Sequence, residues 1–232
     1  MSLKPSAIRR RRRDERGVVA VEAALVLPMV VLLIFGMVEF SLLLRDYVSL
    51  TAATRAGTRL ASAEAGAGAG TCDPSPAPPC TPASSPKLAQ DAADAMQRAL
   101  TGVPNNSIDY VLIYRANGKG YPCASPSSST GCNADVGTTM PTTCSGYNSC
   151  VMFTWNATKG AFRYASGSWD STLINACVNG AAQDSVGIYL KVTHKWMTGL
   201  FGSTISINDR SVSKFEPLSV ETCSSTSMSP HP

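Results

Sequence analysis

The pattern of hydrophobic and polar positions divides the chain into one long apolar segment and a series of shorter alternating segments. Residues 18–44 hold only two charged side chains, Glu22 and Glu39, and residues 23–38 hold none. A helix of 27 residues is about 40 Å long, which exceeds the hydrocarbon core of a bilayer, about 30 Å. The segment is apolar on every face, so it is poorly suited to being a buried core helix. We therefore predict a transmembrane helix over residues 18–44.

The helical pattern continues beyond the apolar segment. Residues 45–65 are rich in Ala, Leu and Arg and contain no proline, so we expect them to extend the helix outward. Residues 66–86 are rich in Gly, Pro and Ser, which predicts a linker or a disulfide-pinned loop. Residues 87–100 have the apolar spacing of a second helix, which Gly102 and Pro104 would end.

The rest of the chain favours an antiparallel sheet. The predicted strands are residues 108–115, 150–155, 161–164, 186–196 and 203–215. Residues 156–160 suit a hairpin turn, residues 116–149 predict a loop, and residues 173–182 suit a short helix. The fold class is therefore α+β: a long N-terminal transmembrane helix that extends outward, followed by a disulfide-rich domain over residues 87–223. The Ser/Pro-rich residues 224–232 are predicted to be a disordered tail.

Positive charge is concentrated before the apolar segment. Seven of the residues before Gly17 are Lys or Arg and two are acidic, whereas the rest of the chain is nearly neutral. A basic run can bind nucleic acid, but beside an apolar segment it acts as a topology signal, so we expect no nucleic-acid partner. The positive-inside rule predicts a single-pass protein in the cell membrane with a cytoplasmic N-terminus and an extracytoplasmic C-terminal domain. Residues 1–17 are interpreted as a basic leader without regular structure in water.

All eight cysteines follow the apolar segment. They are Cys72, Cys80, Cys123, Cys132, Cys144, Cys150, Cys177 and Cys223. An even number of cysteines on the exported side indicates disulfides, whose connectivity stays open. Proximity alone suggests the pairs Cys72–Cys80 and Cys144–Cys150. Because no C-x-x-C pair occurs and the chain has only two histidines, we expect no metal site.

Residues typical of catalysis are scarce. The sequence lacks the H-E-x-x-H, G-x-S-x-G and P-loop patterns, and His194 and His231 are its only histidines. We therefore expect neither enzymatic activity nor a cofactor.

The stretch "RGVVAVEAALVL" places a carboxylate at the start of the transmembrane segment. The basic leader ends in Gly17, four small apolar residues follow, and Glu22 comes next. Inserting an ionised side chain costs about 2.5–3.5 kcal/mol at the centre of a membrane helix and less near the interface. One interpretation is structural, in which Glu22 reaches headgroup water or pairs with Arg16. The other is functional.

The functional interpretation follows from a resemblance. The window is similar to the type III signal of type IV pilins and pseudopilins, which implies cleavage between Gly17 and Val18 by a prepilin peptidase. Glu22 would then be the fifth residue of the mature chain and its assembly glutamate. Cleavage would expose an amino group on Val18 in a region of low dielectric constant. A carboxylate one turn away, on the same or a neighbouring subunit, would offset that charge.

A longer match narrows the family. "ERGVVAVEAALVLPMVVLLIFGMVEF", followed by "AATRAGTRLAS", resembles the TadE-like family, minor pseudopilins of the tight-adherence (Flp-type) pilus assembly system. The resemblance implies a membrane protein that supports pilus assembly and contacts other pilin-like subunits and pilus assembly proteins. It assigns no role to Glu39, which we expect at the membrane interface. Pairing of Glu39 with Arg45 or with a partner helix is the alternative. The alternative is a bitopic surface protein whose Cys-rich exported domain binds a ligand or a surface.

Overall fold

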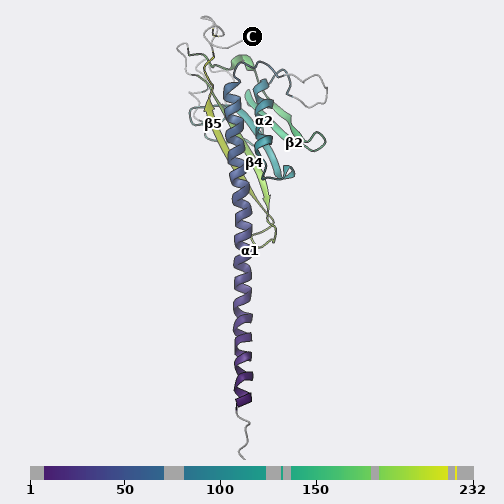
Figure 1. Ribbon diagram of the computed structural model, residues 1–232. Coiled ribbons are helices and arrows are strands. Elements are labelled where there is room, and N and C mark those ends of the chain that lie inside the picture. Colours follow the sequence, from purple (N-terminus) through teal and green to yellow (C-terminus); the bar gives the residue numbers. More distant parts are fainter. Residues whose placement is uncertain are drawn as a thin grey trace, which may run out of the picture. The chain divides into compact units, whose positions relative to one another are not determined.

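The computed structural model describes residues 8–70, 81–123, 132, 137–178, 183–218 and 223, and for residues 8–16 it describes the backbone only. The helices and strands are α1 (Ile8–Ala63), α2 (Lys87–Ala99), β1 (Ile108–Ala116), β2 (Ser149–Asn156), β3 (Ala161–Trp169), β4 (Ser185–Lys195) and β5 (Thr204–Lys214) (Figure 1). Short 3-10 turns occur at η1 (Asn105–Ser107) and η3 (Ser171–Leu173). The α+β fold class is confirmed.

The described chain forms two compact units. The first comprises the chain up to Leu44 together with residues 196–203, and the second comprises residues 45–195 and everything from Thr204 onward. Residues 45–63, expected as a helix extension outside the domain, therefore belong to the second unit. Helix α1 passes from one unit into the other without interruption.

Helix α1 begins earlier than the sequence predicts. Its first residue is Ile8, so the helix includes much of the basic leader, for which we expected no regular structure. That expectation is wrong for residues 8–16. Arginine is a good helix former, and extending an existing helix costs far less than nucleating a new one. Residues 1–7 lie outside the described part of the chain.

The second unit contains a five-stranded antiparallel sheet with the strand order β3-β2-β1-β4-β5. All five predicted strands are present, and β3 continues past its predicted end at Tyr164 to Trp169. The extension was missed because "ASGSW" is mostly small and polar. Gly167 has a φ of +99°, and a Cβ there would lie 2.3 Å from the carbonyl oxygen of Cys150. The strand thus needs a glycine at this position.

The alternation of side chains along the strands gives the sheet two different faces. One face packs against α1 and α2, which lie beside each other in Figure 1, and forms the main core. Leu50, Ala53 and Ala61 of α1 and Leu88 and Met96 of α2 are fully or almost fully buried there. The opposite face carries a smaller cluster made by Leu112, Tyr114 and Ala116 of β1 with Cys144 and Cys150.

Two further segments are partly described by the structure: the predicted short helix over residues 173–182 and the predicted linker over residues 66–86. The short helix predicted over residues 173–182 is wrong for residues 174–178, which follow η3 without helical structure. There the backbone N–H of Asn175 donates to the Asp184 carboxylate at 2.8 Å instead of to a helical carbonyl. In the predicted linker, Ala69 pairs with Pro86 in an isolated bridge. Residues 71–80 and 179–182 lie outside the described part of the chain.

Gly57 of α1 packs closely against α2 and β4. A Cβ built on Gly57 would lie 2.5 Å from Cγ of Met96 and 2.9 Å from Cδ1 of Ile188.

We predict that Gly57→Val lowers the free energy of unfolding by about 1–3 kcal/mol, because it overpacks the contact of α1 with α2 and β4. The melting temperature of the detergent-solubilised full chain measures the effect. Ala52→Val, at an exposed position of the same helix, is the control and should change stability by only a few tenths of a kcal/mol. Equal effects of the two variants would contradict the packing argument.

Glu64 makes the stability of the second unit depend on pH. Burial raises the pKa of Glu64 from 4.5 to about 7, helped by a hydrogen bond with Asp91 and by its charge, while Lys87 acts in the opposite direction. The folded state therefore binds more protons than the unfolded state between these two pH values. The contribution of Glu64 to stability is present below about pH 4.5 and is lost as the pH rises through about 7.

We predict that Glu64→Gln removes this contribution to the pH dependence. The melting temperature of the variant should rise relative to that of the unmodified chain as the pH increases across the window. Thermal scans on either side of the window measure it, and Glu216→Gln, at an exposed carboxylate, is the control. Parallel pH profiles for Glu64→Gln and the unmodified chain would show that Glu64 does not titrate as described.

Candidate functional site

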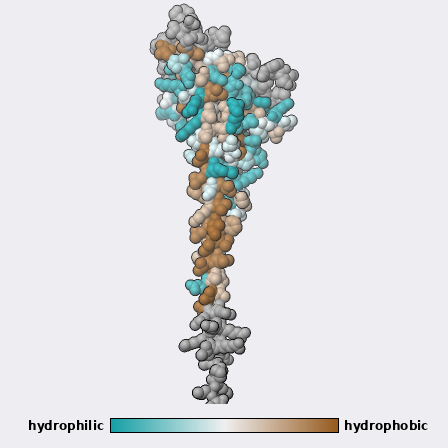
Figure 2. Space-filling model, viewed as in Figure 1, coloured by the Kyte–Doolittle hydropathy of each residue, from teal (hydrophilic) through white to brown (hydrophobic). Residues whose placement is uncertain are grey.

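Between residues 23 and 38 the surface of α1 is apolar on every side. In the described part of the chain, Gly17–Ala63 is the one helix that is long and apolar enough to cross a membrane, and its most apolar window is entirely exposed. Figure 2 shows hydrophobic side chains lining this stretch of α1. An apolar cylinder of this kind needs lipid or other helices around it, because in water its surface would remain unfavourably hydrated.

The residues predicted to form the processing and assembly signal lie on consecutive turns of this helix. Gly17 is helical, and a Cβ built on it would meet nothing within 4 Å. Val18 is 67% exposed, and Glu22 is also exposed. Residues four apart share a helix face, so the Glu22 side chain lies on the same face as Val18. Within the described side chains Glu22 has no hydrogen-bond or ion-pair partner. The proposed pairing with Arg16 lies outside the described side chains.

Glu39, unlike Glu22, has hydrogen-bond partners within the described part of the chain. Its side chain is almost fully buried, and its carboxylate accepts hydrogen bonds from the backbone N–H of Met197 at 3.1 Å and from the Thr198 hydroxyl at 2.8 Å. The backbone N–H of Thr198 donates to the same carboxylate. These donors come from the loop between β4 and β5. Arg45 donates to the carbonyl oxygen of Gly102 at 2.8 Å and lies 3.4 Å from Asp46.

The partner of Glu39 was missed because it is 158 residues away in the sequence. One general signal was available. A buried carboxylate at the end of an apolar helix needs hydrogen-bond donors, and backbone N–H groups of a loop can supply them. The sequence therefore indicates that Glu39 needs hydrogen-bond donors but does not identify the residues that supply them.

In the second unit, polar side chains of α1 hold the helix against the sheet. Asp46 Oδ2 lies 2.7 Å from Nδ1 of His194 on β4, and both side chains are buried. Further along the helix, the Thr54 hydroxyl donates to Asp209 on β5 at 2.6 Å. His194, considered above only as a scarce catalytic base, therefore has a structural role in positioning the helix.

Three cysteine pairs lie at disulfide distance in the described residues. Cys123–Cys132, Cys144–Cys150 and Cys177–Cys223 have Cα–Cα distances of 5.7, 5.2 and 5.8 Å. These separations are typical of disulfides. The pair suggested by proximity, Cys144 and Cys150, is among them. Cys72 and Cys80 lie outside the described part of the chain.

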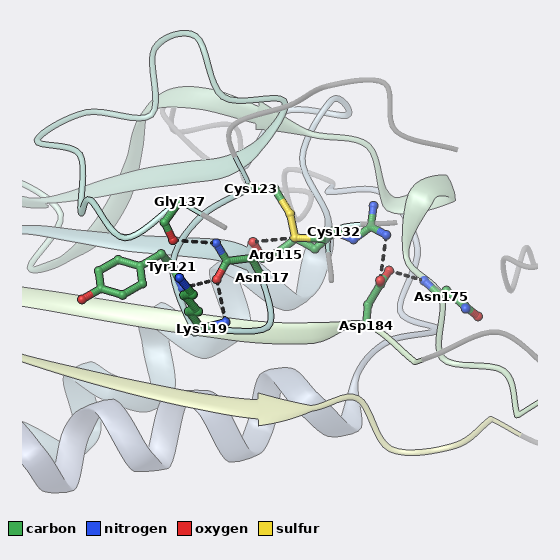
Figure 3. Close-up of a disulfide and its surroundings, with 9 residues drawn as sticks. All are labelled: Arg115, Asn117, Lys119, Tyr121, Cys123, Cys132, Gly137, Asn175 and Asp184. Carbon is green, nitrogen blue, oxygen red and sulfur yellow. Dashed lines mark hydrogen bonds and ion pairs between the residues drawn. A yellow bond between two sulfur atoms is a disulfide. The ribbon is translucent and has the colours of Figure 1, made fainter. Parts of the chain in front are cut away.

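The Cys123–Cys132 disulfide lies beside a polar cluster at the end of β1 (Figure 3). Arg115 of that strand forms an ion pair with Asp184 at 2.7 Å, and Asn175 donates to the other oxygen of the same carboxylate. Burial raises the pKa of Asp184, although the charge of Arg115 and these hydrogen bonds act in the opposite direction. These contacts hold strand and loop ends together. We assign it a structural role.

No metal centre is formed by the described side chains, among which no group of three or more His, Cys, Asp or Glu residues converges. Among the described side chains of the first unit, α1 offers a largely apolar surface, the exposed carboxylate of Glu22 and the buried carboxylate of Glu39.

Comparison with known proteins gives a family-model match for part of α1. Residues 17–59 match the family model described as TadE-like protein, which confirms the resemblance drawn from the sequence. The matched range begins at Gly17 and contains Val18, Glu22 and Glu39. This match and the candidate transmembrane helix support a pilus-associated membrane protein. No curated protein and no solved structure matches the chain.

Proposed function

We propose that this TadE-like chain is a minor pseudopilin-like membrane protein that supports assembly of a tight-adherence (Flp-type) pilus. A prepilin peptidase would process it between Gly17 and Val18 on the cytoplasmic side, and the Cys-rich domain would face outward. The observation that carries the proposal is the placement of Glu22. It lies one turn after Val18, directly behind the basic leader, on a helix that is exposed on every side.

The energetics of helix association in lipid give Glu22 its importance. Lipid tails are as apolar as Val and Leu, so burying those side chains against another helix contributes little hydrophobic driving force. Between residues 18 and 38 Glu22 is the only charged side chain. An ionised carboxylate there is costly unless it is paired. The new amino group on Val18 of a neighbouring subunit would supply the pairing charge and select that neighbour.

Gly17 also suits a cleavage site within a helix. Glycine lowers helix stability by about 1 kcal/mol relative to alanine, which eases local unwinding around the Gly17–Val18 bond. No other side chain crowds the position, since a Cβ there would have open space around it. A peptidase in the membrane therefore has access to this bond.

Processing is tested by N-terminal sequencing of the protein isolated from a host membrane with an active prepilin peptidase. We predict that the mature chain begins at Val18. Gly17→Leu should block cleavage, because it adds a bulky side chain beside the scissile bond and removes the helix-weakening glycine. Ala24→Leu, at an exposed position two turns further along, is the matched control and should be processed normally. An intact leader on the unmodified chain would contradict processing.

Assembly is tested by substitution of Glu22. We predict that Glu22→Ala and Glu22→Gln insert normally but fail to co-purify with other pilin-like subunits and abolish piliation, whereas Glu22→Asp retains part of both. Because the carboxylate would act on the amino group that cleavage creates, Gly17→Leu combined with Glu22→Ala should be no worse than either change alone. Membrane fractionation, co-purification and electron microscopy of cells measure these outcomes. Normal piliation with Glu22→Ala would favour the alternative of a simple anchored surface protein.

A further inference from the structure

The loop between β4 and β5 has an unusual surface for a hairpin loop. Residues 196–203 read "WMTGLFGS" and include no charged side chain. Met197, Leu200 and Phe201 are 72%, 48% and 60% exposed. The rings of Trp196 and Phe201 lie 5.4 Å apart, so the loop presents a connected apolar surface instead of scattered side chains. In water such a surface would be unfavourable, which indicates an apolar or interfacial environment.

The loop is fastened to α1 within the first unit. The backbone N–H groups of Met197 and Thr198 and the Thr198 hydroxyl all donate to the Glu39 carboxylate. One turn earlier on the helix, Cζ of Phe201 lies 3.8 Å from a Cβ built on Gly36. An open groove of about 660 Å³ runs along this contact and is lined by apolar side chains of α1, including Leu32, Met37 and Phe40.

The attachment point lies at the end of the lipid-facing part of the helix. From Val18 to Val38 the helix rises by about 32 Å, close to the thickness of the hydrocarbon core, about 30 Å. Gly36 and Glu39 therefore fall at the edge of the core, at the C-terminal end of the apolar span. Glu39 is tolerated there because three donors from the loop satisfy its carboxylate. Tryptophan and other amphipathic aromatic side chains favour this headgroup level.

We propose that the loop of residues 196–203 is a membrane-interface anchor. Leu200 and Phe201 insert between lipid headgroups and acyl chains of the leaflet that holds the C-terminal end of the apolar span, Trp196 lies at the headgroup level, and an acyl chain occupies the groove beside Phe201. The occupant is lipid because the loop surface continues the lipid-facing surface of α1 and carries no charge or polar pattern that would select a protein partner. The proposal rests on α1 spanning the membrane and does not require pilus assembly.

The test uses the full chain reconstituted in phospholipid vesicles, with insertion checked by flotation. Tryptophan fluorescence is quenched by phospholipids that carry a nitroxide either near the acyl carbonyl or near the chain end. Trp196→Phe isolates the signal of this side chain from that of the other two tryptophans. We expect quenching that depends on Trp196 and is stronger for the nitroxide near the carbonyl. Equal quenching of the unmodified chain and Trp196→Phe would overturn the proposal.

Paired substitutions distinguish insertion of the loop into the bilayer from a position of the loop near the bilayer surface. Leu200→Ser with Phe201→Ser should cause loss of the Trp196-dependent quenching, because the loop loses its apolar tip. Ile205→Ser with Val212→Ser removes comparably exposed apolar side chains, 40% and 41%, from β5. This control should leave the quenching unchanged. Unchanged quenching in the Leu200 and Phe201 variant would count against insertion.

Photo-crosslinking identifies the occupant directly. A benzophenone amino acid in place of Leu200, in the same vesicles and in cell membranes, should yield adducts with phospholipid. Adducts with a second copy of the chain or with another protein, and none with lipid, would show that the loop is a protein-docking surface and would overturn the assignment. Since cleavage at Gly17 plays no part in this assay, its result is independent of the proposed processing.

Discussion

Packing of one face of α1 into the core of the second unit is the contact on which the remaining structure depends. Ala53, Gly57 and Ala61 recur at intervals of four and form a stripe of small residues, so the helix backbone approaches Met96 of α2 and Ile188 of β4 closely. The Asp46–His194 pair adds a buried polar contact on the same side. Helix α1 thus contributes its C-terminal part to the core of the second unit, while its apolar part belongs to the first.

Three glutamates on or at the end of α1 show how position decides the behaviour of one residue type. Glu22 is exposed on an apolar helix surface and has no partner among the described side chains. Glu39 is buried and satisfied by backbone and hydroxyl donors. Glu64, at the end of the helix beside Asp91, has its pKa raised to about 7, first by burial. Glu22 is the carboxylate that we propose as an assembly signal, Glu39 fastens the loop between β4 and β5, and Glu64 makes a pH-sensitive contact.

Local patterns predicted most of the elements correctly. The apolar run, helix α2 and the five strands follow from periodicity and β-branched content, which depend on neighbouring residues only. The errors occur where longer-range contacts compete. The leader is helical from Ile8 because a neighbouring helix nucleates it, and residues 174–178 are not helical because the Asp184 carboxylate takes up a backbone N–H. The predicted end of β3 came too early because "ASGSW" is mostly small and polar, whereas the strand continues with Gly167 packed against Cys150.

The sequence by itself determined the membrane segment, the basic leader, the spacing of Gly17, Val18 and Glu22, and the approximate limits of the strands. These properties are set by residues close together in the chain. Only the tertiary structure decided the donors to Glu39, the pairing of His194 with Asp46, and the membership of residues 45–63 in the domain. Each depends on groups brought together from distant positions, and hydrogen-bond partners separated by about 150 residues leave no local pattern to read.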